Sequence, residues 1–273
     1  MHVCTAPGTC SIPDRVEYGA IYAQGTIGLK YEEIEIDTPS HAYRVIGYVS
    51  STSVPSNIIN TQSGEIFIPA YHREENINNG EYLPVTQIAD VDDTVAKAPF
   101  RNNETITKVI FAGESQLKSI GQRAFLVSGS TGTPSVSRVS KLTGFYIDTG
   151  GVLTAGFPAS LKTIHKNAFY GCSALTGPIL LPSGVIEIGE LAFGNATNIT
   201  EIVIPKSVIT MGPKAFDGWG SSTNPYLVQK IILLGRTAVP PPPDWDPNWL
   251  GDSSSKIPSK VDVEYSPNTP FTP

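Results

Sequence analysis

The chain has 273 residues, a formal net charge of −6 and only 16% charged residues, which argues against nucleic acid as a partner because phosphate binding needs a basic surface. It contains no apolar run of about 18–20 residues, so no membrane insertion is expected from this chain. Its 25 glycines and 23 prolines indicate many turns and predict a mainly β protein with little helix.

The N-terminal part is expected to contain an arm followed by a cap. Residues 1–28 are rich in Pro and Gly and predict an irregular N-terminal arm. Apolar residues alternate with polar ones in 29–36 and again in 42–49, which predicts two strands of a hairpin. We expect residues 29–60 to form a hairpin cap, because a terminal repeat of any stack has an apolar face without a neighbour.

Residues 61–235 are organised by a sequence repeat. One pattern occurs three times, in Leu161–Phe169, Val185–Phe193 and Val208–Phe216, and its Ala-Phe pairs recur after 24 and 23 residues. Each repeat also has a strand-like run that ends in Pro, such as Ile199–Pro205. A fixed period in the twenties predicts a stack of similar units, in which each unit buries its apolar face against the next.

The same pattern extends toward the N-terminus with interruptions. Earlier strands are expected at Glu65–Pro69 and Ile106–Phe111, and a later one at Val228–Leu233. Phe125 and Phe169 lie 44 residues apart, about 20 more than one period. The strand-like run Leu142–Ile147 between them accounts for the excess as one repeat with two insertions, of 11 residues before the run and 9 after it.

The alternation of each strand run assigns inward and outward side chains. The inward residues are expected to be Val109, Phe145, Pro178, Ile202 and Ile231, followed two positions later by a second inward set that includes Leu180. The Phe of each Ala-Phe pair is expected to close the opposite wall as a structural repeat residue. These structural residues are Phe100, Phe125, Phe169, Phe193 and Phe216.

The outward position of each run is the candidate ligand-binding strip. It is apolar in every repeat and consists of Phe67, Ile110, Tyr146, Ile179, Val203 and Ile232. A contiguous exposed apolar strip is typical of a contact surface, whereas ordinary β-propensity would produce the same residue types without a ligand. Gly144 and Gly177 at a neighbouring position are expected to leave a shallow notch beside Tyr146.

Two long loops form a second candidate surface. Residues 126–141 and 217–226 both follow an Ala-Phe pair, so both are expected to project from the same rim of the stack. Their larger side chains, Arg138, Trp219 and Tyr226, suit recognition, since loops on a rigid scaffold commonly bind partners. Tolerated insertions would look the same.

No pattern in the sequence predicts catalysis, a metal or a cofactor. The four histidines are scattered and match no zinc spacing. Asp90–Asp93 could offer oxygens to calcium, but it lacks the Gly and the distal Glu of an EF-hand loop. Cys172 is expected to be a small buried residue, and Cys4 and Cys10 could either form a disulfide or remain free thiols.

The stack is expected to end near residue 235. Residues 236–273 contain a polyproline run and predict a Pro-rich C-terminal cap and tail. Trp245 and Trp249 are expected to fold over the last repeat, and a strand in 260–265 could pair as a final one.

The joined repeat, a strand ending in Ile-Pro followed by an Ala-Phe pair, resembles the BspA-like (Treponema-type) leucine-rich repeats of bacterial surface proteins. The resemblance implies a right-handed solenoid, with one strand per repeat on the concave face and short strands or 3₁₀ turns on the convex face. It also implies a non-catalytic protein, on the cell surface or secreted, that binds a protein or glycan ligand on host matrix or other cells. A structural spacer in a larger surface protein is the alternative. Residues 1–15 lack the apolar core of a secretory signal, so an exported form would be a mature chain or a fragment.

Overall fold

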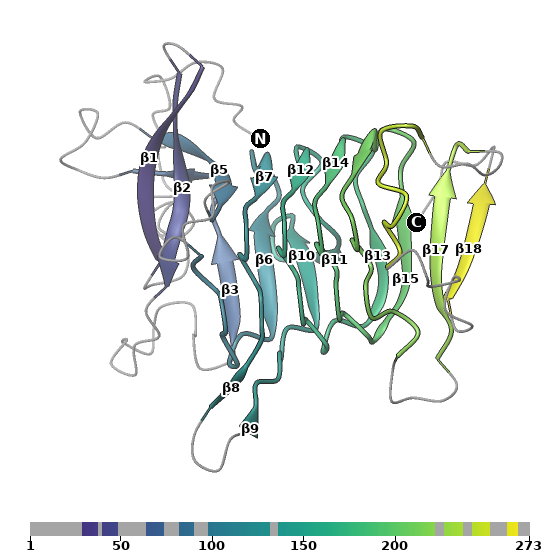
Figure 1. Cartoon of the computed structure of the whole chain (residues 1–273). Helices are drawn as coiled ribbons and strands as arrows, with labels where there is room; N and C mark the ends of the chain where they lie inside the picture. Colours follow the sequence, from purple (N-terminus) through teal and green to yellow (C-terminus); the bar gives the residue numbers. More distant parts are fainter. Residues whose placement is uncertain are drawn as a thin grey trace.

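The computed structural model describes residues 29–37, 40–48, 64–73, 82–89, 98–131, 136–221, 227–236, 242–251 and 261–266. Every regular element in these ranges is a β-strand, and none of them contains a helix, let alone one long and apolar enough to cross a membrane. The strands lie side by side along one long axis of the molecule (Figure 1). The expected mainly β class is therefore confirmed.

The hairpin expected near the N-terminus is present. Strands β1 (Leu29–Asp37) and β2 (Ser40–Tyr48) pair antiparallel, and β2 pairs in parallel with β5 (Leu83–Ile88). A short strand, β4 (Tyr71–His72), pairs with the beginning of β5. The hairpin thus forms one end of the sheet that continues with β5 and β7 (Figure 1).

That sheet contains a series of short parallel strands, which we call the short-strand ladder. Each repeat contributes the residues just before its Ala-Phe turn, and Ile120, Ile164, Ile188 and Met211 are paired in register. The pairing is unbroken from repeat to repeat. The ladder consists of β5, β7 (Ser119–Ile120), β12 (Thr163–Ile164), β14 (Glu187–Ile188) and β16 (Thr210–Met211).

The strand-like runs that end in Ile-Pro form a second series, which we call the long-strand ladder. It is divided into two four-stranded sheets. The first comprises β3 (Glu65–Ile68), β6 (Lys108–Ala112), β10 (Gly144–Asp148) and β11 (Leu153–Ala155). The second comprises β13 (Gly177–Leu180), β15 (Ile199–Ile204), β17 (Gln229–Leu234) and β18 (Val261–Ser266).

The two insertions that the sequence located between Phe125 and Phe169 are both hairpins. The first contains β8 (Ser130–Thr131) and β9 (Val136–Ser137), which form a separate two-stranded sheet. The second turns β10 back on itself, so that β11 pairs antiparallel with β10. This second insertion divides the long-strand ladder.

The core between the two ladders is organised by the five Phe residues of the Ala-Phe pairs. Their rings stack in chain order, with centroids of neighbouring rings 5.0–5.7 Å apart. All five Phe side chains are buried, and so are Ala168 and Ala192, the small residues that precede Phe169 and Phe193. Cys172 lies fully buried beside this stack, which confirms its expected role as a small core residue.

The turns that carry these Phe residues also connect the repeats by backbone hydrogen bonds. The N–H of each Phe donates to the carbonyl of the Ala in the next repeat, for example Phe193 to Ala215 at 2.8 Å. The residue before the Ala adopts a left-handed backbone, with φ of 56° at Asn167, 54° at Leu191 and 55° at Lys214. This conformation costs most residues about 1–2 kcal/mol, so the turns with Leu191 and Lys214 carry backbone strain.

The last repeat is covered by residues 242–251, as the sequence predicted. The Phe216 N–H donates to the Trp249 carbonyl, and Trp249 thereby takes the place of the next Ala. Trp245 bridges to Met211, and the two indoles pack at 5.3 Å with only 4% and 6% of their surfaces exposed. The expected final strand is also present, because β18 pairs in parallel with β17.

Candidate functional site

The most distinctive feature of the surface is the division of the long-strand ladder between β10 and β13, which we call the ladder break. In the same two repeats, β12 and β14 remain paired on the other side of the core. At the break, the described strands β10 and β13 are joined only at their beginnings, where the Thr176 N–H donates to the Thr143 carbonyl at 3.5 Å. Beyond that point β11 pairs with the edge of β10, so the two sheets separate.

Two aromatic side chains explain why the ladder opens here. Phe145 occupies the inward slot that holds Val109 and Ile202 in sister repeats, and the insertion adds a further ring, Phe157. The rings of Phe145 and Phe157 stack at 4.6 Å, and Phe157 also packs against Phe169 at 5.9 Å. Because close-packed cores do not compress, the additional ring widens the core and separates the strands that cover it.

On the far side of the break, the pairing of β13 with β15 contains a bulge, in which β15 carries the extra residue, Thr200, between Ile199 and Glu201. The pairing with β15 shifts by one residue between Gly177 and Pro178, and Gly177 has a left-handed φ of 73°. Ile179 consequently pairs opposite Ile202 and lies in the core with 7% exposure. The expectation that Ile179 faces outward, and that Pro178 and Leu180 face inward, is therefore wrong by one position.

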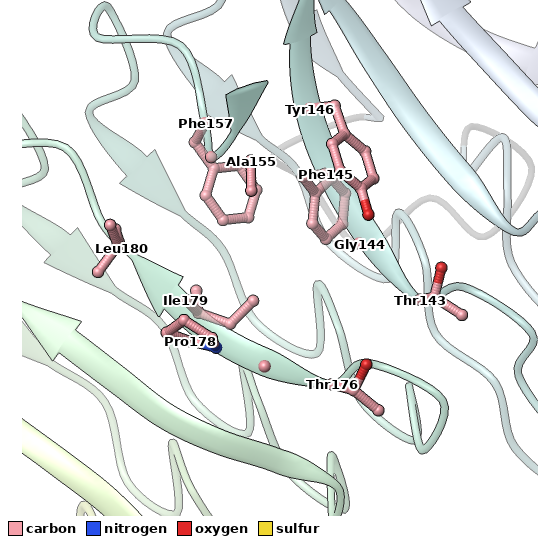
Figure 2. A pocket seen from close by; sticks show the side chains of 12 residues that line it. Thr143, Gly144, Phe145, Tyr146, Ala155, Phe157, Thr176, Pro178, Ile179 and Leu180 are labelled. Atoms are coloured by element: carbon pink, nitrogen blue, oxygen red, sulfur yellow. The ribbon is translucent and has the colours of Figure 1, made fainter. Parts of the chain in front are cut away.

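A cavity of about 230 Å³ lies in the ladder break. Its walls come from β10 and β11 on one side and from β13 on the other (Figure 2). None of the lining side chains carries a charge, and the polar ones are two threonines and a tyrosine. The lining residues are Thr143, Gly144, Phe145, Tyr146, Ala155, Gly156, Phe157, Thr176, Gly177, Pro178, Ile179 and Leu180.

The structure brings Tyr146 together with the two glycines of the expected notch, but the two glycines differ. The ring of Tyr146 lies over Gly144, so that a Cβ at Gly144 would come within 3.1 Å of the phenol oxygen. A Cβ at Gly177 would meet nothing within 4 Å. The notch is therefore filled at Gly144 and open at Gly177.

A cation and a carboxylate hold Tyr146 in this position. The Lys108 ammonium lies 5.7 Å from the centre of the Tyr146 ring and 2.9 Å from a carboxylate oxygen of Glu65. The hydrogen bond and charge of Glu65 raise the pKa of Lys108, which keeps this ammonium protonated. The position of the Tyr146 ring beside the break is thus fixed by Lys108 on β6 and, through Lys108, by Glu65 on β3.

The expected ligand-binding strip is not one continuous open surface. Phe67, Ile110 and Val203 have exposures of 4%, 9% and 3%, and Ile110 packs with Phe67 in a small cluster that Tyr146 covers in part. The break separates this cluster from Val203 and Ile232. Of the six strip residues, Tyr146 and Ile179 line the cavity, the first from β10 and the second from β13.

Of the larger side chains expected in the two long loops, Trp219 and Arg138 contact the repeats. Trp219 is 2% exposed, packs against Phe216 and donates its indole N–H to the Phe193 carbonyl at 3.0 Å. Arg138 lies 3.4 Å from a carboxylate oxygen of Glu104. Tyr226 lies outside the described residues.

The described residues contain no group of three His, Cys, Asp or Glu side chains that could hold a metal ion. Asp90–Asp93, Cys4 and Cys10 lie outside the described part of the chain. His165 is partly buried, and this burial lowers its pKa. Burial raises the pKa of the Cys172 thiol to about 12, so this thiol is inert at neutral pH.

Each repeat contributes one strand to each ladder and one Ala-Phe turn, and the repeats share one core between the ladders. This arrangement defines a stacked-repeat protein. Residues 145–238 match the family model of the BspA type leucine-rich repeat region in six copies. This segment of the chain therefore carries leucine-rich repeats of the BspA type. The stacked strands continue on the N-terminal side of the matched segment, through β6 to β3.

Solved structures with a similar chain path include leucine-rich repeat proteins from bacteria. One from Bacteroides ovatus is 20% identical, with a TM-score of 0.46, and the match covers 75% of this chain and 48% of that protein. One from T. pallidum is also 20% identical, with a TM-score of 0.47 and coverage of 76% and 69%. A leucine-rich cell surface protein from Faecalibacterium prausnitzii is 18% identical, with a TM-score of 0.44 and coverage of 77% and 48%. This chain thus spans about half the length of two of these proteins, and no curated protein matches it significantly.

Proposed function

We infer that this chain is a non-catalytic recognition module, on the cell surface or secreted, and that the ladder break is its contact site. The observation that carries the proposal is the uncharged cavity of about 230 Å³ between β10–β11 and β13. The BspA-type repeats favour a binding or structural role, and a contact site needs a surface feature that ordinary stacking does not produce. The break is such a feature.

The proposed architecture is a right-handed leucine-rich-repeat solenoid with the long-strand ladder on its concave face. Parallel strands joined by crossovers are right-handed in nearly all proteins, which supports this handedness. The N-terminal hairpin and residues 242–251 are proposed as the caps of its two ends, in line with the domain limits 1–28, 29–60, 61–235 and 236–273.

Between the two proposed ligand classes, the cavity favours protein over glycan. Its volume is below the roughly 300–1,000 Å³ of pockets that enclose a whole small molecule. Sugar hydroxyls need several polar partners, whereas the Thr143 hydroxyl already donates to the Thr107 carbonyl at 2.9 Å. An apolar side chain of a protein ligand fits this lining with fewer unpaired groups.

The test uses the purified chain on an array of extracellular matrix proteins and an array of immobilised glycans. Ala155→Arg introduces a charge on an exposed residue that lines the cavity. Thr154→Arg is the matched control, because Thr154 is also exposed on β11 but its side chain points to the other face. We expect binding to a matrix protein that Ala155→Arg reduces at least tenfold and Thr154→Arg leaves within threefold.

The alternative function is a structural spacer in a longer surface protein. The closely stacked Phe rings and the covered last repeat make the chain a stiff unit, which suits that role. Absence of binding on both arrays would support the spacer and contradict the recognition module. Equal loss of binding in both Arg variants would place the contact surface elsewhere on the chain.

A further inference from the structure

The ladder break exposes two strand edges, and their backbone groups can be assigned from the hydrogen bonds around them. The Gly156 N–H donates to the Phe145 carbonyl, and the Thr149 N–H donates to the Val152 carbonyl. In an antiparallel pair the hydrogen-bonded positions alternate, so Thr154 directs its N–H and C=O toward Ile147 on β10. The N–H and C=O groups of Leu153 and Ala155 therefore point away from β10, toward the break.

The edge of β13 faces the same break with fewer donors. The Leu181 N–H donates to the Val203 carbonyl, so the groups of Leu180 point to the opposite side, into the break. Pro178 also lies on this side, and it has no N–H. Thus β11 offers a complete edge, whereas β13 offers mainly apolar side chains.

These two edges interrupt the long-strand ladder from within, whereas its other edge strands, β3 and β18, lie at its two ends. Strands β6 and β15 each pair with a neighbour on both sides, which leaves no free backbone edge. All three residues of β11 are exposed, and Leu153 has 44% of its surface in solvent. An exposed strand edge with unpaired donors and acceptors is a template for another extended chain.

We propose that the ladder break binds an extended, uncharged peptide segment of a partner protein, which adds as a strand to the free edge of β11. The peptide backbone pairs with Leu153 and Ala155, and one apolar side chain of the peptide enters the cavity beside Tyr146 and Ile179. This inference rests on the proposed recognition function and gives it a ligand class and a binding mode. Affinity comes from the main-chain hydrogen bonds, and selectivity comes from the cavity.

The chemistry of the cavity sets the residue type that it accepts. A charged side chain would lose its hydration without finding a counter-charge, because the twelve lining residues include no Asp, Glu, Lys, Arg or His. The aromatic walls and the open space at Gly177 suit a branched aliphatic or a small aromatic side chain. We expect peptides with such a residue at every second position, since alternate side chains of a strand share one face.

The experiment begins with a phage-displayed library of random twelve-residue peptides, selected against the complete chain. A selected peptide is then synthesised with N-methyl groups on alternate backbone nitrogens, in two complementary sets. Strand addition predicts that one set loses at least tenfold in affinity, because its N–H groups face β11, whereas the other set stays within threefold. Equal effects of the two sets would overturn the proposal.

The protein side of the interface is tested at Ala155. Ala155→Pro removes one edge N–H at a position where proline is tolerated, because that N–H is not paired within the sheet. Ala155→Ser keeps the N–H and serves as the matched control. We expect at least a tenfold loss of peptide affinity in the first variant and less than a threefold change in the second, with circular dichroism unchanged in both.

Amide signals of the isotope-labelled chain locate the bound peptide independently of these variants. Binding should shift the signals of Leu153, Ala155 and Leu180 and slow the hydrogen exchange of the first two. A peptide that shifts β18 instead overturns the inference and leaves the recognition function standing. Binding to the glycan array alone, if it is lost in Ala155→Arg, would also overturn the peptide proposal and leave the recognition function standing. A dimer of the chain that depends on Ala155 would overturn it too, because the edge of β11 would then bind a second copy of the chain. Failure of peptides and of both arrays would remove the recognition function as well.

Discussion

The two ladders of the same repeats respond differently to one insertion. The short-strand ladder continues through β12 and β14 without interruption, while the long-strand ladder opens between β10 and β13. Both ladders cover one shared core, so the extra volume of Phe157 has to be accommodated by one of them. The ladder next to the insertion opens, and the ladder held by the Ala-Phe turns does not.

The comparison shows what fixes the geometry of this fold. Along the short-strand ladder, every turn donates a backbone hydrogen bond to the next turn, such as Phe169 to Ala192 at 2.8 Å. These bonds and the Phe stack set the spacing of successive repeats. The long-strand ladder follows this spacing on both sides of the break, and it departs from the spacing where the rings of Phe145 and Phe157 meet.

The largest expected effect is on the free energy of unfolding, and it should differ between a Phe in the regular core and a Phe beneath the break. Phe193→Ala removes a fully buried ring between Phe169 and Phe216 and should lower the free energy of unfolding by about 3–5 kcal/mol. Phe157→Ala should cost less, about 3 kcal/mol or below, because the structure beside the cavity can collapse or hydrate. Urea unfolding followed by circular dichroism measures both values.

Equal costs would mean that the core beneath the break is as rigid as the rest, and the explanation by added volume would then fail. Phe157→Leu is a useful control, since it retains apolar volume. It should recover most of the stability that Phe157→Ala loses.

The second prediction concerns the thiol of Cys172, which lies in the repeat that borders the break. Burial raises its pKa from 9.0 to about 12, so the folded chain holds the thiol proton more tightly than the unfolded chain. The stabilisation is present below pH 9 and is lost as the pH rises toward 12, by about 1.4 kcal/mol per pH unit. Ala occupies the equivalent position 196, so Cys172→Ala is the appropriate reference.

We expect the free energy of unfolding of the native chain to fall more steeply than that of Cys172→Ala between pH 9 and 11. Taking the difference between the two proteins cancels the titration of other groups that ionise in this range. Parallel pH profiles would show that water reaches Cys172 through the break. Reaction of the folded chain with more equivalents of a thiol reagent at pH 8 than the Cys172→Ala variant takes up would lead to the same conclusion.

The regular stacking of the repeats could be predicted from the sequence because each repeat contains the same Ala-Phe and strand pattern. The Ala-Phe period predicted the ring stack, and counting residues between Phe125 and Phe169 located both insertions before any strand was known. The C-terminal cap was predicted from Trp245 and Trp249, since an uncovered last repeat needs large apolar side chains. These features follow from local patterns and from the need to bury each repeat.

The ladder break was not predicted, although the sequence holds two signals for it. Leu175–Pro182 has eight residues where Ile199–Pro205 has seven, and this extra residue shifts the register so that Ile179, rather than Pro178, pairs opposite Ile202. Gly150-Gly151 between two short apolar runs is typical of a tight hairpin, and both residues have positive φ. The pairing partner of β11 and the position of Phe157 depend on tertiary packing, which no pattern in one repeat specifies.

The third prediction uses the extra residue in β13. Deleting Pro178 shortens the run 175–182 to the seven residues of the run 199–205, so the register shift at Gly177 should disappear. We expect a gain of about 0.5–1 kcal/mol, since removing the bulge allows one more hydrogen bond between this strand and β15. Thermal unfolding measures the gain, and hydrogen exchange of the Ile179 amide reports the register. A loss above about 2 kcal/mol would show that the bulge is required for Ile179 to pack.

The smallest expected effect lies in the regular ladder itself, at the left-handed residue before each Ala-Phe pair. Leu191 has a φ of 54°, a conformation that costs most residues about 1–2 kcal/mol but that Asn tolerates. Asn167 occupies the same position in the preceding repeat with a φ of 56°. Leu191→Asn should therefore raise the free energy of unfolding by about 0.5–1 kcal/mol after the loss of some side-chain packing. Leu191→Ala is the control, because it loses the same packing and keeps the strain. If the Asn variant is no more stable than the Ala variant, strain at these turns does not limit the sequence, and the rigidity of the short-strand ladder comes from the Phe stack alone.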